Sequence, residues 1–175
     1  MKEMVRYGFI LALICTVAAG LLASVNSLTK MRIMQQAQAE EEASLKGVIP
    51  EGEYFEPVKS GEEIIYYKAF DKGGNLAGIA FKASGKGYSS TIETMVGMKK
   101  DGTITAIKVL SQNETPGLGA RIAEPSFIGQ FANKNITRLA EVQAITGATI
   151  SSKAVIDSVK KKAEEIKVMI KNVPK

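Results

Sequence analysis

Residues 146–151 combine residue types that could hold a phosphate-linked group. They read Thr-Gly-Ala-Thr-Ile-Ser and directly precede a basic segment with helical periodicity. Unpaired amides and the helix dipole favour an anionic phosphate at a helix N-terminus. Gly147 permits backbone angles that other residues avoid, and Ala148 leaves space for a bulky group. Thr149 is therefore expected to present its hydroxyl at the start of a helix, with the amides of residues 150–153 directed at the phosphate.

The same segment has a second interpretation that needs no ligand. Serine and threonine are common helix N-caps, so Ser151 or Ser152 could simply cap the helix that follows. Lys153 could add positive charge beside a phosphate or lie in solvent. The spacing alone does not choose between a capped helix and a cofactor site.

The composition excludes several kinds of catalytic and metal site. The chain has no histidine, and its one cysteine, Cys15, lies in an apolar run. This excludes Ser-His-Asp and Cys-His catalysis, His/Cys zinc sites and cysteine-ligated iron–sulfur clusters within the chain. A redox role would therefore need an organic cofactor. Basic residues do not cluster as in a nucleic-acid footprint, apart from residues 160–162 on one side of a helix, so no nucleic-acid partner is expected.

The N-terminal segment is predicted to anchor the chain in a membrane. No charged residue occurs between Tyr7 and Thr29, and about 20 apolar residues cross a bilayer as a helix. A cleaved signal peptide is the alternative, but cleavage after Ala23 would put Leu21 where a small residue is preferred. An uncleaved anchor over residues 1–30 is therefore favoured. A short tail before a large domain is typical of a signal anchor and places the domain outside the cytoplasm.

The rest of the chain predicts a stalk and one α+β domain. Residues 31–60 are expected to form a helical stalk and a loop, and residues 61–175 the domain. Two hairpins with Gly-Gly and Asp-Gly turns are predicted over residues 64–82 and 92–110. A short helix at 125–133, an extended segment at 139–145 and a final helix from Ser152 to about Ile170 follow. The final helix has an apolar stripe formed by Val155, Val159, Ala163, Ile166 and Ile170.

This order of strands and helices indicates the fold class. Strands followed by helices favour an α+β domain with a mainly antiparallel sheet and flanking helices. An N-terminal transmembrane helix precedes that domain in the predicted organisation.

Residues 146–151 resemble the flavinylation motif of the FMN-binding domain family, Ser/Asp-Gly-Ala-Thr/Ser-x-Ser/Thr. Gly147, Ala148 and Ser151 match this pattern, and Thr146 replaces the usual Ser or Asp. The resemblance implies that Thr149 carries FMN through a phosphodiester bond installed by a dedicated flavin transferase.

A second segment is similar to the hallmark loop of the same family. Residues 114–119 read Glu-Thr-Pro-Gly-Leu-Gly. On its own, this segment predicts a tight turn in which Pro116 fixes one backbone angle and Gly117 allows the next. The resemblance implies that the loop lies against the flavin, with contacts from Glu114, Thr115, Gly117 and Leu118. Glu114 is assigned no proton-transfer role, and Arg121 could either form a structural ion pair or approach the flavin.

The anchor and both motifs together resemble the G-subunit family of Rnf complexes, over nearly the whole chain. The resemblance implies an electron-transfer protein with covalent FMN and no catalytic site of its own. Its complex would couple electron transfer between ferredoxin and NAD to sodium or proton translocation. The implied partners are other membrane and redox subunits, the lipid bilayer and, during maturation, the flavin transferase. The implied location is a single-pass protein of the plasma (inner) membrane with the flavin domain on the extracytoplasmic side.

Three alternatives stay open at this point. The first is a component like the C subunit of the sodium-translocating NADH:quinone oxidoreductases, which resemble the Rnf family. The second is a signal-anchored extracellular binding module without a redox role. The third is a flavoprotein that acts as a free-standing extracellular electron shuttle.

Overall fold

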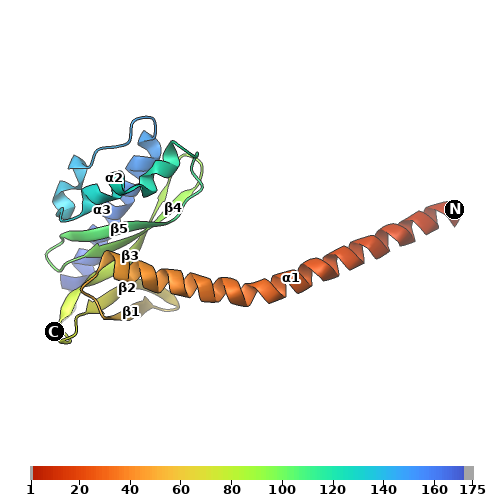
Figure 1. Ribbon diagram of the computed structural model, residues 1–175, viewed down its shortest axis with the longest axis horizontal. Coiled ribbons are helices and arrows are strands. Elements are labelled where there is room, and N and C mark those ends of the chain that lie inside the picture. Colours follow the sequence, from red (N-terminus) through yellow and green to blue (C-terminus); the bar gives the residue numbers. More distant parts are fainter. Residues whose placement is uncertain (1, 172–175) are drawn as a thin grey trace. The chain divides into compact units, whose positions relative to one another are not determined.

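The computed structural model describes residues 2–171, and the chain divides into two compact units with their boundary between Glu42 and Ala43. Helix α1 spans Lys2–Val48, and all but its last residues belong to the first unit (Figure 1). Within it, Glu3–Lys30 has a mean hydropathy of 2.4, is long enough to cross a membrane and buries none of its surface inside the protein. An exposed apolar surface of this length is suited to lipid. The predicted apolar N-terminal helix is confirmed.

The second unit is built on one five-stranded antiparallel sheet (Figure 1). Each strand pairs with the next along the chain, and the strands are β1 (Tyr54–Ser60), β2 (Glu63–Phe70), β3 (Leu76–Lys86), β4 (Thr91–Met98) and β5 (Ile104–Ser111). Side-chain carboxylates stabilise two of the turns, because Asp71 accepts from the amide of Gly73 (2.8 Å) and Asp101 from that of Thr103 (2.9 Å). Both predicted hairpins are confirmed, as β2–β3 and β4–β5.

Helices cover one face of this sheet and enclose the main core. They are η1 (Gly119–Ala123), α2 (Pro125–Ile128), η2 (Gly129–Phe131), η3 (Ile136–Glu141) and α3 (Thr149–Lys171). Helix α3 packs on β3 and β4. Four residues of its predicted apolar stripe are fully buried, and Ile170 is half-buried. Full burial of one such aliphatic side chain contributes about 1.5–3 kcal/mol, so this stripe holds α3 against the sheet.

The other face of the sheet carries a smaller core. Leu45 and Val48, from the last turn of α1, and Ile49 pack there against side chains of β2, β3 and β4. The Thr105 hydroxyl donates to the Val48 carbonyl over 2.6 Å. This bond satisfies one of the carbonyls that a helix end leaves without a partner.

The second unit starts earlier than the sequence predicted. It begins at Ala43, where residue 61 was expected, and strand β1 lies in the range 31–60 that was predicted as a helical stalk and a loop. Pro57 and Gly52 interrupt any strand pattern in this range, because both residue types are typical of loops. Proline is tolerated here because β1 is an edge strand, with β2 as its only neighbour in the sheet.

Two further segments differ from the prediction. Residues 139–141 form the end of η3 instead of an extended segment, because the Asn135 side chain accepts from the amide of Thr137 (3.2 Å) and starts a 3₁₀ turn. Helix α3 begins at Thr149 instead of Ser152. Thr149 therefore lies inside the first helical turn.

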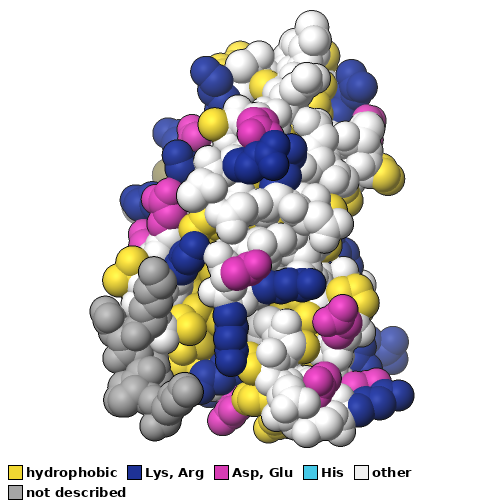
Figure 2. Space-filling model, turned by 90° about the vertical axis from the view of Figure 1, so that its left-hand side faces the viewer, with side chains coloured by type: hydrophobic (Ala, Val, Ile, Leu, Met, Phe, Trp, Pro, Cys, Tyr) yellow, Lys and Arg dark blue, Asp and Glu magenta, His cyan; other side chains and the backbone are white. Residues whose placement is uncertain are grey.

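Charged side chains of both signs share the molecular surface. On the face in Figure 2, lysine and arginine side chains are interspersed with aspartate and glutamate. Among the described residues, Arg138 pairs with Glu141 at 2.8 Å and Lys162 with Glu165 at 3.2 Å, with these side chains in contact with solvent. Exposed pairs of this kind contribute about 0–1 kcal/mol each, so the two apolar cores hold the fold together.

Candidate functional site

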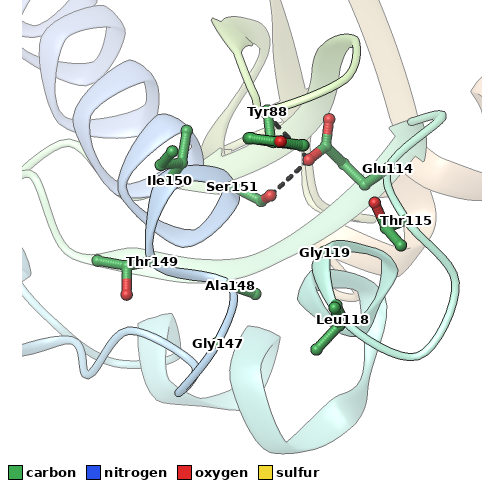
Figure 3. Close-up of a pocket in the computed structure, with 10 residues that line it drawn as sticks. All are labelled: Tyr88, Glu114, Thr115, Leu118, Gly119, Gly147, Ala148, Thr149, Ile150 and Ser151. Atoms are coloured by element: carbon green, nitrogen blue, oxygen red, sulfur yellow. Dashed lines mark hydrogen bonds between the residues drawn. The ribbon is translucent and has the colours of Figure 1, made fainter.

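A pocket of about 540 Å³ lies between the loop after β3, the segment after β5 and the start of α3 (Figure 3). This volume is typical of sites for small molecules and cofactors. Its lining residues are Tyr88, Glu114, Thr115, Leu118, Gly119, Gly147, Ala148, Thr149, Ile150 and Ser151.

The wall at the start of α3 presents unpaired amides to this pocket. Gly147 has φ = 83°, a left-handed conformation that favours glycine, and it turns the chain into the helix. The amide of Ser152 donates to the Ala148 carbonyl over 3.0 Å, which makes it the first amide with an intrahelical acceptor. The amides of residues 149–151 precede it and have no such acceptor. The free amides are thus those of residues 149–151, rather than 150–153 as predicted.

The three hydroxyls of this first turn have different surroundings. Ser152 is fully buried, donates to the Ala148 carbonyl (2.9 Å) and accepts from the Ile145 amide (3.0 Å). Ser151 is 2% exposed and donates to Glu114 over 2.5 Å. Thr149 is exposed, and its side chain has no hydrogen bond to any residue that the structure describes. In Figure 3 it points away from Glu114.

The predicted N-cap role of Ser151 or Ser152 is wrong. Both residues lie inside a helix that begins at Thr149. Their hydroxyls bond to Glu114 and to the Ala148 carbonyl, so both serine side chains fix tertiary structure around the helix start.

Glu114 occupies the opposite wall and is 5% exposed. Its carboxylate accepts from the amides of Tyr88 (3.1 Å), Ser89 (2.9 Å) and Ser90 (2.9 Å), and from the Ser151 hydroxyl. Burial by itself would raise the pKa of Glu114. The hydrogen bonds from Ser151 and from the three amides outweigh burial and lower this pKa from 4.5 to about 2. Glu114 is therefore ionised at neutral pH and joins two walls of the pocket.

Two glycines make room for this carboxylate. A Cβ atom at Gly87 would lie 2.6 Å from Glu114 Oε1. A Cβ atom at Gly119 would lie 2.8 Å from Ser151 Oγ and 2.8 Å from Glu114 Cβ. Side chains larger than hydrogen at these positions would push Glu114 and Ser151 apart.

The segment after Glu114 forms the tight turn that its sequence predicts. The Leu118 amide donates to the Thr115 carbonyl over 3.2 Å, and Gly117 has φ = 75°. Proline followed by a glycine of positive φ is typical of a type II turn. The turn places Thr115 and the half-exposed Leu118 on the pocket wall, whereas Gly117 lies in the turn outside that lining.

The structure thus brings most of the predicted site residues together. Thr149, Gly147, Ala148, Ser151, Glu114, Thr115 and Leu118 all line the pocket. Arg121 forms an ion pair with Glu124 at 3.3 Å, as in the first of the two roles considered for it. Neither Arg121 nor Lys153 lines the pocket. Sequence reasoning missed Tyr88, Gly119 and Ile150. No local sequence pattern indicates that the amides of residues 88–90 donate to Glu114.

Comparisons with known proteins identify the family. The family described as "RnfG N-terminal region" matches residues 1–48, and the FMN-binding domain family matches residues 87–164. The G subunit of the ion-translocating oxidoreductase complex of Methanosarcina acetivorans is 37% identical over 172 residues, which cover 90% of this chain and 91% of the relative. The chain belongs to the G-subunit family of ion-translocating oxidoreductase complexes.

Two further relatives support the family and the fold. The G subunit of the proton-translocating ferredoxin:NAD(+) oxidoreductase complex of Clostridium ljungdahlii is 30% identical, over 89% of this chain and 88% of the relative. A crystal structure of the C subunit of the Na(+)-translocating NADH-quinone reductase from Parabacteroides distasonis has a TM-score of 0.50 and 22% identity, covering 63% of each chain. The latter shows a shared fold.

Family membership supplies the cofactor and the setting of this G-subunit homologue. It is an FMN-binding, membrane-associated electron-transport protein of an oxidoreductase complex, and other subunits of the complex are its partners. Every residue that lines the pocket falls within the matched FMN-binding domain.

The pocket residues fit FMN chemically. Free amides at the start of α3 suit a phosphate. The exposed apolar side chains of Tyr88, Leu118 and Ile150 suit a planar aromatic ring.

Proposed function

We propose that this chain carries FMN on Thr149 through a phosphodiester bond and relays electrons between partner subunits. The complex would couple electron transfer between ferredoxin and NAD to translocation of sodium ions or protons, as the names of its relatives in Clostridium ljungdahlii and Acetobacterium woodii state for theirs. The observation that carries the proposal is the exposed Thr149 hydroxyl at the N-terminus of α3, on the wall of a pocket within an FMN-binding domain. This hydroxyl has no hydrogen-bond partner among residues 2–171 as the structure describes them.

The start of α3 supports attachment of a phosphate at this residue. A phosphodiester keeps one negative charge, and the free amides of residues 149–151 together with the helix dipole stabilise an anion there. Helix α3 is held by its buried stripe, so this anion site is fixed in place before any ligand arrives.

Attachment would be a substitution at phosphorus without a redox change. Thr149 Oγ1 bonds to the phosphorus of the flavin half of a flavin dinucleotide, the pyrophosphate bond of that donor breaks, and a nucleoside monophosphate leaves. The hydroxyl proton goes to a base of the flavin transferase. The chain needs to supply only an accessible hydroxyl, which is consistent with its lack of histidine.

Once attached, FMN supplies the capacity to accept and donate electrons, and the chain supplies binding and orientation. Glu114 holds the loop of residues 88–90 and Ser151 in place. Leu118 and Ile150, at 48% and 55% exposure, offer apolar contact that excludes water from a ring lying between them. A covalent tether keeps the cofactor on the relay while successive partners approach.

We also propose a single-pass topology with the flavin domain outside the cytoplasm. The membrane-spanning part would lie within the apolar Glu3–Lys30 segment of α1. The flavin transferase would then act on the extracytoplasmic side. Residues 1–30 would serve as the anchor, and the flavin-carrying part would lie C-terminal to α1.

In-gel fluorescence tests the attachment. The full chain, expressed with the transferase, is denatured and separated by electrophoresis. We expect a fluorescent band for the wild type and for Thr149→Ser, which keeps a hydroxyl, and no fluorescence for Thr149→Ala. A fluorescent Thr149→Ala band would place the flavin elsewhere. A dark wild-type band would favour a domain without covalent flavin, and purification without partner subunits would favour a free-standing shuttle.

A further inference from the structure

Two hydroxyls of the first turn of α3, those of Thr149 and Ser151, line the same pocket. Position along the chain does not by itself decide which one accepts the flavin, because the two residues are only two positions apart, on either side of Ile150. Ser152 is excluded from the choice because it is fully buried and bonds to both the Ala148 carbonyl and the Ile145 amide.

The difference between the two candidate hydroxyls lies in Glu114. Ser151 is 2% exposed and donates its proton to Glu114 Oε2, whereas Thr149 is exposed and points away from that carboxylate (Figure 3). A hydroxyl that donates to a carboxylate and is closed off from solvent cannot be reached by a phosphorus centre held on another protein.

A carboxylate beside a serine could also activate that serine as a general base, but Glu114 is poorly suited to this role. Three amides and the hydroxyls of Ser151 and Ser90 already donate to it. The three amides and Ser151 lower its pKa to about 2, whereas a general base works best when its pKa is near the operating pH. Glu114 therefore holds Ser151 without activating it.

We propose that Glu114 is a positioning residue that withdraws Ser151 from flavin transfer and leaves Thr149 as the acceptor of this turn. The proposal rests on the proposed attachment of FMN at Thr149. Gly87 and Gly119 leave the space in which Glu114 binds Ser151, because a Cβ atom at either position would come within 3 Å of Glu114.

The proposal is tested with the full chain expressed together with the flavin transferase. Tryptic peptides spanning residues 139–153 contain all the candidate hydroxyls, and fragmentation in a mass spectrometer locates the flavin. We expect no flavin on Ser151 in Thr149→Ala. When Glu114→Ala is combined with Thr149→Ala, we expect a gain of flavin on Ser151, from none to a fraction that the peptide spectrum detects.

A second variant also separates Ser151 from Glu114, so the test does not depend on Glu114→Ala being folded. Gly119→Ala combined with Thr149→Ala keeps the carboxylate and separates it from Ser151 through the added Cβ atom. A matched control adds Ser151→Ala to each combination and should abolish the new signal. Circular dichroism at the expression temperature establishes that each variant is folded.

The outcomes separate this inference from the proposed function. Flavin on a residue other than Thr149 in the wild type would overturn the proposed attachment. Flavin on Ser151 in Thr149→Ala alone would show that Glu114 does not withdraw Ser151. An unmodified Ser151 in both combined variants would show that the helix position, not Glu114, selects the acceptor.

Discussion

The two walls of the pocket differ in how completely their polar groups are hydrogen-bonded. At the start of α3, the amides of residues 149–151 and the Thr149 hydroxyl have no protein partner in the described structure. Across the pocket, Glu114 is buried and accepts five hydrogen bonds. The difference indicates that the donors of the first wall are free to bind a ligand phosphate. The carboxylate of the second wall is already satisfied by protein donors and stabilises the pocket.

Removing the charge of Glu114 should have the largest effect on stability. Glu114→Gln places an amide donor where the carboxylate meets the donors of residues 88–90 and Ser151. We expect the free energy of unfolding to fall by ~2 kcal/mol or more, because buried donors lose their acceptor. The measurement is urea unfolding. Glu124→Gln, which breaks an exposed pair with Arg121, should cost less than ~1 kcal/mol. Equal losses in the two variants would contradict the contrast between the walls.

Acid should weaken the Glu114 wall selectively. The pKa of Glu114 is about 2 in the folded chain and 4.5 when unperturbed, so the unfolded chain binds its proton first as the pH falls. The stabilisation by Glu114 is therefore complete above about pH 4.5 and is lost as the pH falls towards about 2. The free energy of unfolding of the wild type should drop more steeply over this range than that of Glu114→Gln. Parallel curves would show that Glu114 is not held as an ion.

A smaller loss of stability is expected when a side chain is added next to Glu114 and Ser151. Gly119→Ala adds a Cβ atom 2.8 Å from Ser151 Oγ, which should cost about 1–3 kcal/mol. Gly129→Ala is the matched control, because a Cβ atom there meets nothing within 4 Å and the backbone has φ = −62°. Thermal unfolding of both variants should show a lower Tm for Gly119→Ala only. A fully stable Gly119→Ala would mean that the wall can rearrange.

The open wall should tolerate substitution. In the chain without flavin, Thr149→Ala removes an exposed hydroxyl without protein partners, so the free energy of unfolding should stay within ~0.5 kcal/mol of the wild type. Urea unfolding of chain produced without the transferase measures this. A loss of more than about 1 kcal/mol would show that Thr149 has a structural role and would remove the contrast with Glu114.

The features that could be predicted from sequence are local ones. The hairpins follow from Gly-Gly and Asp-Gly turns, the buried face of α3 from its periodicity, and the turn at Gly117 from its proline and glycine. The local pattern of a glycine, a small residue and a hydroxyl also predicts that Thr149 lies at a helix start, whereas its assignment as the flavin acceptor comes from the family resemblance and stays a prediction.

The features that were missed depend on contacts between distant residues. Strand β1 exists because it pairs with β2, and its own residues carry the weak signal of an edge strand with Pro57. Glu114 binds Ser151 across 37 positions and Ser90 across 24 positions of the chain. No local pattern encodes that pairing, so the residue could be singled out from its motif while its function as a link between two walls could not.

Peptide mapping of the wild-type chain tests the central claim most directly. The chain is purified under denaturing conditions after expression with the flavin transferase, and tryptic peptides covering residues 139–153 are fragmented in a mass spectrometer. The account predicts an added mass equal to FMN less one water, located on Thr149. An unmodified peptide from a flavin-containing complex, or the added mass on any other residue, would contradict it.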